Sequence, residues 1–104
     1  MVIGESKITI VQGDSYERYI TIDGISLDLI EGIYFSSDKL NISKKLILKS
    51  NVFVLSLTSE ETKDLPVVNT NYDLTIKFNN NKINTIQYQA TISILKKNNK
   101  VETW

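Results

Sequence analysis

Paired carboxylates are the residues of this chain whose types and spacing come nearest to chemistry. One pair is Glu60 with Glu61, and the other is Asp14 with Glu17. Hydrolysis of a glycosidic bond needs two carboxyl groups across a cleft, one of them with a raised pKa. Both pairs also have a structural explanation, because Asp14 follows a glycine in a turn and Glu61 suits the start of a helix. We therefore expect no catalytic residue in either pair.

The composition argues against most other chemistry. The 104 residues include no histidine and no cysteine, which removes the usual general base, the commonest metal ligand and any disulfide. The acidic residues lack the spacing of a calcium loop, and the glycines lack that of a phosphate-binding loop. Twelve basic and twelve acidic residues cancel, so no positive excess is available for a phosphate backbone. We expect no enzyme activity, no metal, no cofactor and no nucleic-acid partner.

No targeting or membrane segment is visible in the sequence. Residues 1–6 have neither a basic head nor a long apolar centre. The longest apolar runs are only a few residues, far short of the roughly 20 that span a bilayer. We therefore expect no membrane partner and a protein that is made and folded in a cytoplasm.

Three aromatic residues are candidates for binding a protein partner. Tyr19 and Tyr34 fall on the face of their predicted strands opposite to the apolar face. Exposed tyrosine favours protein interfaces because it combines a rigid apolar body with a polar tip, although scattered surface tyrosines also occur without a function. Trp104 is the only tryptophan and the last residue, and it either extends into solvent or docks on a neighbour.

Alternation of apolar and polar residues with a period of two predicts an all-β chain. The clearest segment is 72–78, with Tyr72, Leu74, Ile76 and Phe78 on one face. Segment 52–57 is apolar on both faces, which is typical of a central strand or of an outer face that a neighbour covers.

Other segments follow the same period less clearly. In segment 86–94 we expect the alternate residues to face the core, Tyr88 among them. Leu27 and Leu29 also alternate and continue toward a strand at 33–35. Segment 42–50 is either one strand or an edge strand whose outer side is rich in lysine. Shorter strands are predicted at 7–11 and 16–22.

One short helical turn is predicted near 58–64. Thr58 and Glu61 have the spacing of a capping box, in which each side chain bonds the backbone N–H of the other residue. Pro66 cannot continue a helix, so about one turn fits. Together with turn signals every 8–12 residues, these patterns predict one β-sandwich domain over 1–104. Its ordered core is expected over about 7–96, followed by a polar tail at 97–104.

Four short motifs, in order along the chain, resemble a group of small structural proteins of tailed bacteriophages and prophages. That group includes the N-terminal domain of upper baseplate proteins. The motifs are Gly13-Asp14, Asp28-Leu29, Leu57-Thr58 with Glu61-Thr62 and Leu65, and Tyr72-Asp73-Leu74. Two departures stand out: Glu61 replaces the group's aspartate, and the group's glycine in the last strand is missing near Tyr88-Gln89-Ala90.

The resemblance implies an immunoglobulin-like antiparallel β-sandwich of about seven strands. It further implies a non-enzymatic component of the virion, in the baseplate, the tail or an accessory position on the head, made in the cytoplasm of the bacterial host. Its partners would be other phage structural proteins, in a homo-oligomer or a larger assembly. Two alternatives stay open: a module that binds carbohydrate or the host surface, and a small inhibitor or regulator encoded by a mobile element.

Overall fold

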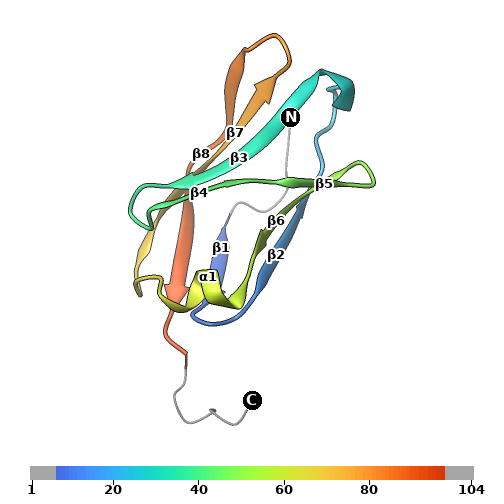
Figure 1. Ribbon diagram of the computed structural model, residues 1–104. Helices are drawn as coiled ribbons and strands as arrows, with labels where there is room; N and C mark the ends of the chain where they lie inside the picture. Colours follow the sequence, from blue (N-terminus) through green and yellow to red (C-terminus); the bar gives the residue numbers. More distant parts are fainter. Residues whose placement is uncertain (1–6, 98–104) are drawn as a thin grey trace.

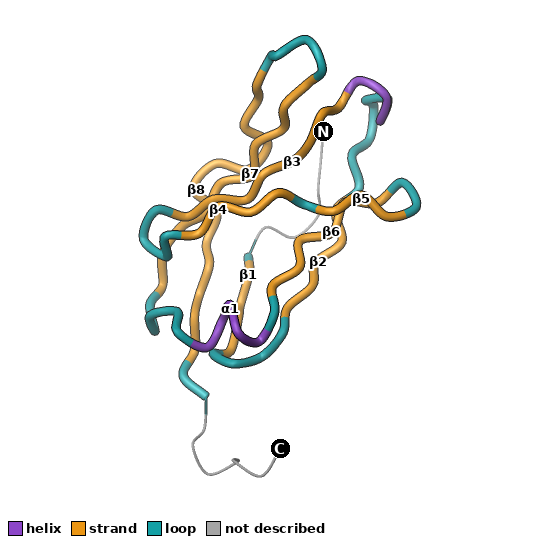
Figure 2. The backbone as a smooth tube through the Cα atoms, viewed as in Figure 1, coloured by secondary structure: helices purple, strands orange, loops and turns teal. Residues whose placement is uncertain are grey.

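The computed structural model describes residues 7–97 and consists of two β-sheets packed face to face, shown in Figure 1. One sheet has five strands in the order β1-β8-β7-β3-β4, and the other has three in the order β2-β6-β5. The strands are β1 (Ile8–Val11), β2 (Tyr16–Ile20), β3 (Ile30–Ser37), β4 (Ile42–Lys45), β5 (Ile47–Lys49), β6 (Val52–Leu57), β7 (Asn69–Phe78) and β8 (Ile83–Leu95). Figure 2 shows the two short helices, η1 (Leu27–Leu29) and α1 (Ser59–Lys63), at opposite ends of the sandwich.

This order of strands is that of an immunoglobulin-like sandwich. β2, β6 and β5 occupy the places of strands B, E and D, while β3, β7 and β8 occupy those of C, F and G. Neighbouring strands are antiparallel except β1, which runs parallel to β8 with Ile8 opposite Ile92. The predicted all-β sandwich is therefore confirmed, with eight strands within residues 7–97 instead of about seven.

The additional strand comes from segment 42–50, which crosses from one sheet to the other. β4 pairs with β3 in the large sheet, and β5 pairs with β6 in the small one. Between them Leu46 is buried, and its N–H donates to the carbonyl of Ile33 over 2.8 Å. Leu46 is thus anchored between the two sheets. It divides segment 42–50, which the sequence presents as one lysine-rich strand, into two edge strands.

The inner faces of both sheets contribute to one hydrophobic core. Strands β3 and β7 provide a pair of aromatic rings, Phe35 and Tyr72, whose centroids lie 5.2 Å apart. The predicted alternation is confirmed in β7, where Tyr72, Leu74 and Ile76 are buried in this core. The buried apolar residues of this core are Ile8, Ile10, Ile20, Ile33, Phe35, Leu40, Leu46, Phe53, Leu55, Leu57, Leu65, Tyr72, Leu74, Ile76, Ile92 and Ile94.

Strand β6 is the central strand of the small sheet, as its two apolar faces suggest. Phe53, Leu55 and Leu57 point into the core. Val54 points to the opposite side and lies outside the core cluster, yet it is only 1% exposed. The outer face of the small sheet is therefore closed to solvent at Val54.

Two sequence-based expectations were wrong. Leu27 and Leu29 belong to the 3-10 helix η1 and not to a strand, and Leu29 is exposed. Tyr88 does not face the core, because its side chain is 72% exposed. Both errors concern positions where the chain interrupts regular strand geometry, which period-two alternation cannot reveal.

A β-bulge in β8 turns Tyr88 outward. Tyr72 pairs with Ala90 and Leu74 with Gln87, so β8 uses one more residue than β7 over this stretch. Gln89 has a φ of 51°. Its N–H donates to Asp73 Oδ1 over 2.7 Å, and its carbonyl accepts from Asn71 Nδ2 over 3.0 Å. Side chains of β7 thus hold Gln89 in a left-handed backbone conformation.

Residues 1–6 and 98–104 lie outside the described part of the chain. Trp104 and all of the predicted polar tail 97–104 except Lys97 fall there, so both stay predictions; Lys97 itself is half-buried and forms an ion pair with Asp14. Among residues 7–97, no helix has the length and apolar character needed to cross a membrane.

Candidate functional site

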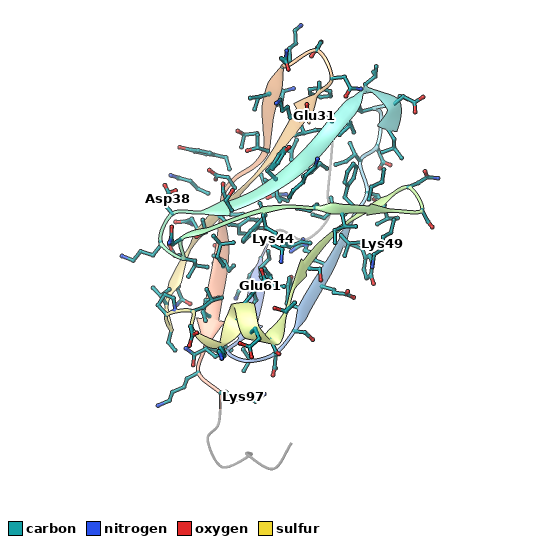
Figure 3. The ribbon with its side chains drawn as sticks, viewed as in Figure 1. Glu31, Asp38, Lys44, Lys49, Glu61 and Lys97 are labelled. Carbon is teal, nitrogen blue, oxygen red and sulfur yellow. The ribbon has the colours of Figure 1, made fainter. Side chains whose placement is uncertain are left out.

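Glu61 serves the helix start that the sequence predicts. Its carboxylate accepts from the Thr58 N–H over 2.9 Å, while the Thr58 hydroxyl oxygen accepts from the Glu61 N–H over 3.2 Å. Lys44, on β4, places its Nζ 2.6 Å from Glu61 Oε2, and the two side chains are labelled in Figure 3. The Lys44 ammonium, followed by the Thr58 N–H, lowers the pKa of Glu61. A general acid needs the opposite shift.

The remaining carboxylates of the two pairs are also engaged separately. Asp14 Oδ1 lies 2.7 Å from Lys97 Nζ, and Glu60 Oε2 lies 2.9 Å from Lys63 Nζ. Glu17 accepts from the Tyr19 hydroxyl over 3.2 Å, and this neighbouring carboxylate raises the pKa of Tyr19. Each of these carboxylates has a local partner. Such pairs are ordinary surface ion pairs and hydrogen bonds, whereas an acid–base pair needs two carboxyl groups that face each other across a cleft. Within the described residues, no three acidic side chains group closely enough to hold a metal ion.

Two of the phage-like motifs contact each other. The Thr62 side chain, fully buried at the end of α1, donates from Oγ1 to the carbonyl of Asp14 over 2.8 Å. The same oxygen accepts from the N–H of Gly13 over 3.0 Å. Beside it, Gln12 Nε2 donates to the Leu65 carbonyl over 2.6 Å.

These bonds join α1 to the turn between β1 and β2, next to each other at the lower end of the sandwich in Figure 1. Gly13 adopts a φ of 82°, which explains a glycine there. The spacing of these motifs therefore follows from a structural requirement: a buried hydroxyl must reach the backbone of a distant turn.

A polar hollow with a volume of about 280 Å³ lies beside the β-bulge. Asp38 and Lys39 line it from the β3–β4 turn, and Asn71, Asp73 and Gln89 line it from β7 and β8. Asn71 and Asp73 already bond the bulged backbone, so their polar atoms support the fold first. We assign no ligand to this hollow.

The structure separates the two tyrosines that the sequence singles out. Tyr19 lies on β2 of the small sheet, and Tyr34 lies on β3 of the large sheet. Tyr34 is half-buried, with Lys45 Nζ 5.8 Å from its ring centroid and its hydroxyl 3.5 Å from Glu31 Oε2. Tyr19, in contrast, is 64% exposed. Because the two tyrosines lie on the outer faces of different sheets, they cannot both contact the same surface of one partner.

Tyr19 instead forms a row with residues that the sequence did not mark as a site. Tyr19 is opposite Val54 in the β2–β6 pairing, and Ile47 is opposite Val54 in the β5–β6 pairing. Directly opposite residues share one face of a sheet, with Cβ atoms about 5 Å apart. Ile47 is 49% exposed. We call the outer surface centred on these three residues the small-sheet face.

The sequence contains part of the signal for the small-sheet face. Alternation assigns Val54 and Ile47 to the faces opposite their core-directed neighbours, and both are apolar. What the alternation lacks is the register, which brings three separate segments into one row. Other exposed apolar side chains lie elsewhere in the described chain, including Leu29, Val67 and Leu95, and single exposed apolar residues are ordinary.

Comparison with known proteins adds no relative. No family model, no curated protein and no solved structure matches this chain. The immunoglobulin-like arrangement consequently rests on the strand order itself, and the phage family stays a prediction from the four motifs.

Proposed function

We propose that this protein is a non-enzymatic structural component of a bacteriophage or prophage particle, in the baseplate, the tail or an accessory position on the head. It acts by docking on other proteins. The family assignment is supported by the ordered motifs of the sequence, and the mode of action by the small-sheet face. The proposal places the protein in the virion after synthesis in the bacterial cytoplasm.

The observation that carries the docking role is the row formed by Tyr19, Val54 and Ile47. Tyr19 and Ile47 are exposed on either side of the buried Val54, in register on one outward-facing sheet, so they offer a partner two apolar contacts on the same face, unlike scattered exposed residues. Tyrosine and aliphatic residues at the centre with charges around them are the composition of protein interfaces. The engaged carboxylates favour this role over catalysis, because each is paired locally.

Detection of the protein in purified particles tests the proposal. Particles induced from a strain that carries the gene would be banded on a density gradient and analysed by quantitative mass spectrometry. We expect the protein at a fixed ratio to the other structural proteins across the particle band. Absence from the band, with the protein recovered in the soluble lysate, would contradict the proposal and favour the inhibitor or regulator alternative.

A further inference from the structure

We infer that the small-sheet face docks on the same face of a second copy of this chain. The inference rests on the proposed function, because it names the partner of that docking surface. Its basis is the arrangement of two opposite charges around the apolar row, which makes the face complementary to itself.

Glu17 and Lys49 occupy opposite corners of the small-sheet face. Glu17 lies two residues before Tyr19 on β2 and is opposite Ser56. Lys49 lies two residues after Ile47 on β5 and is opposite Val52. Since β2 and β5 both run antiparallel to β6, they are parallel to each other, and the two offsets point in opposite directions along them, which places the charges across a diagonal. From the ordinary strand spacing and rise, their Cα atoms are about 17 Å apart.

A two-fold axis in the plane of the contact, perpendicular to this diagonal, places Glu17 of each copy over Lys49 of the other. The same axis crosses the two rows at Val54, so the exposed Tyr19 and Ile47 side chains of both copies lie around the centre of the contact. The strands of the two sheets then cross at a steep angle, which is the orthogonal class of sheet packing. A contact of this type is closed and isologous, so it forms a dimer and not a fibre.

Both charges are available for this contact. Glu17 and Lys49 are exposed, and Lys49 is labelled at the end of β5 in Figure 3. Among residues 7–97, no ion pair includes Lys49. Glu17 has only the Tyr19 hydroxyl as a side-chain partner there, at 3.2 Å, and this bond leaves its second carboxylate oxygen for a cation.

The small area of the face indicates a weak dimer. Three short strands bury less area than the about 800 Å² per partner of a standard stable interface, so we expect a dimer that is populated only at high protein concentration. Such a contact is weak between free chains. In an assembly that holds many copies close together, the effective concentration reaches the millimolar range and the contact forms.

A charge-swap series measured by sedimentation velocity tests the inference, with the full chain at concentrations up to roughly 1 mM, the upper range of effective concentration for tethered sites. We expect Glu17→Lys and Lys49→Glu each to weaken the dimer at least about tenfold, because each single change places like charges opposite each other. The double variant Glu17→Lys/Lys49→Glu should restore dimerisation. Lys39→Glu, the same charge change in the exposed β3–β4 turn, is the matched control and should leave dimerisation unchanged.

A second pair of variants tests the apolar centre. Ile47→Ser should weaken the dimer, and Ile83→Ser, at a comparably exposed position near the tip of the β7–β8 hairpin, should not. Circular dichroism and thermal melting establish that each variant is folded. If a folded Ile47→Ser variant dimerises as the unchanged protein does, the small-sheet face is not the interface.

The outcomes separate this inference from the proposed function. A strictly monomeric unchanged protein at every concentration, or a double variant that stays as weak as the single ones, overturns the isologous dimer even if the protein is found in particles. A dimer that obeys the charge swap supports the inference even if the protein is absent from particles, and only the virion role then fails.

Discussion

Removal of the Thr62 hydroxyl is the most direct test of how the fold is held at the end of α1. In Thr62→Val the side chain keeps its shape, while the N–H of Gly13 and the carbonyl of Asp14 lose their shared partner. Burial of Thr62 prevents water from replacing the hydroxyl itself. The variant therefore separates the hydrogen bonds from the packing.

The magnitude follows from three contributions. Leaving a buried polar group without a partner costs about 1–3 kcal/mol. Gly13 is half-buried and Asp14 is exposed as a residue, so about 1.5 kcal/mol for each group, near the lower end of this range, is appropriate. The added methyl group returns about 0.8 kcal/mol by burial. We expect a net loss of about 2 kcal/mol in the free energy of unfolding, equivalent to a fall of roughly 10 °C in Tm for a domain of this size.

Urea unfolding followed by far-UV circular dichroism measures this loss. Thr9→Val, the same substitution at an exposed position of β1, is the matched control and should change stability by less than about 0.5 kcal/mol. Amide hydrogen exchange adds a local measurement, because the Gly13 N–H should exchange faster in Thr62→Val than in Thr9→Val. If Thr62→Val is as stable as its control, the hydroxyl does not hold the turn and the structural explanation of the motif spacing is wrong.

Three further changes test other parts of the structure. Gln89→Gly should raise the free energy of unfolding by about 0.5 kcal/mol, because glycine relieves the positive φ at some cost in unfolded-chain entropy. Gln87→Gly in the same strand should lower it. A loss of stability in both variants, measured by urea unfolding, would contradict the bulge. Thr58→Ala should cost about 1 kcal/mol by removing the helix cap, and Thr58→Ser should restore most of it in the same assay. The pKa of Glu61 is lowered in the fold, so its contribution is complete above the unfolded value of 4.5 and disappears as the pH falls through the folded value. Glu61→Gln should therefore destabilise the protein at pH 7 by about 0.5 kcal/mol after solvent screening and have no effect at pH 2, and an equal effect at both pH values would refute this assignment.

Turn and cap chemistry was predictable because it depends on residues close together in the sequence. The capping box of Thr58 and Glu61 forms as its spacing predicts, and α1 ends before Pro66. The β7 alternation was equally clear, since each residue's face depends only on its neighbours two positions away. The β-bulge at Gln89 was not predictable from alternation, because side chains of another strand hold its backbone.

The candidate docking surface was likewise only partly predictable from the sequence. The alternation along their strands places both Tyr19 and Tyr34 on the outward face, so the sequence made them equal candidates. Only the pairing of β2, β6 and β5 shows that Tyr19 stands beside Val54 and Ile47, while Tyr34 is half-buried on the other sheet. A position in a strand says which side a residue faces, and it does not say which residues of other strands stand beside it.

The sequence by itself determined the β class of this protein, its short capped helix and its aliphatic interior, because periodicity and local hydrogen bonding act over a few residues. The tertiary structure alone decided the crossing of segment 42–50 between sheets at Leu46, the contact of Thr62 with the turn at Gly13, and the apolar row with its two opposite charges. Each of these depends on register between segments that are distant in the chain. Register is set by how the whole core packs, and no local pattern contains it.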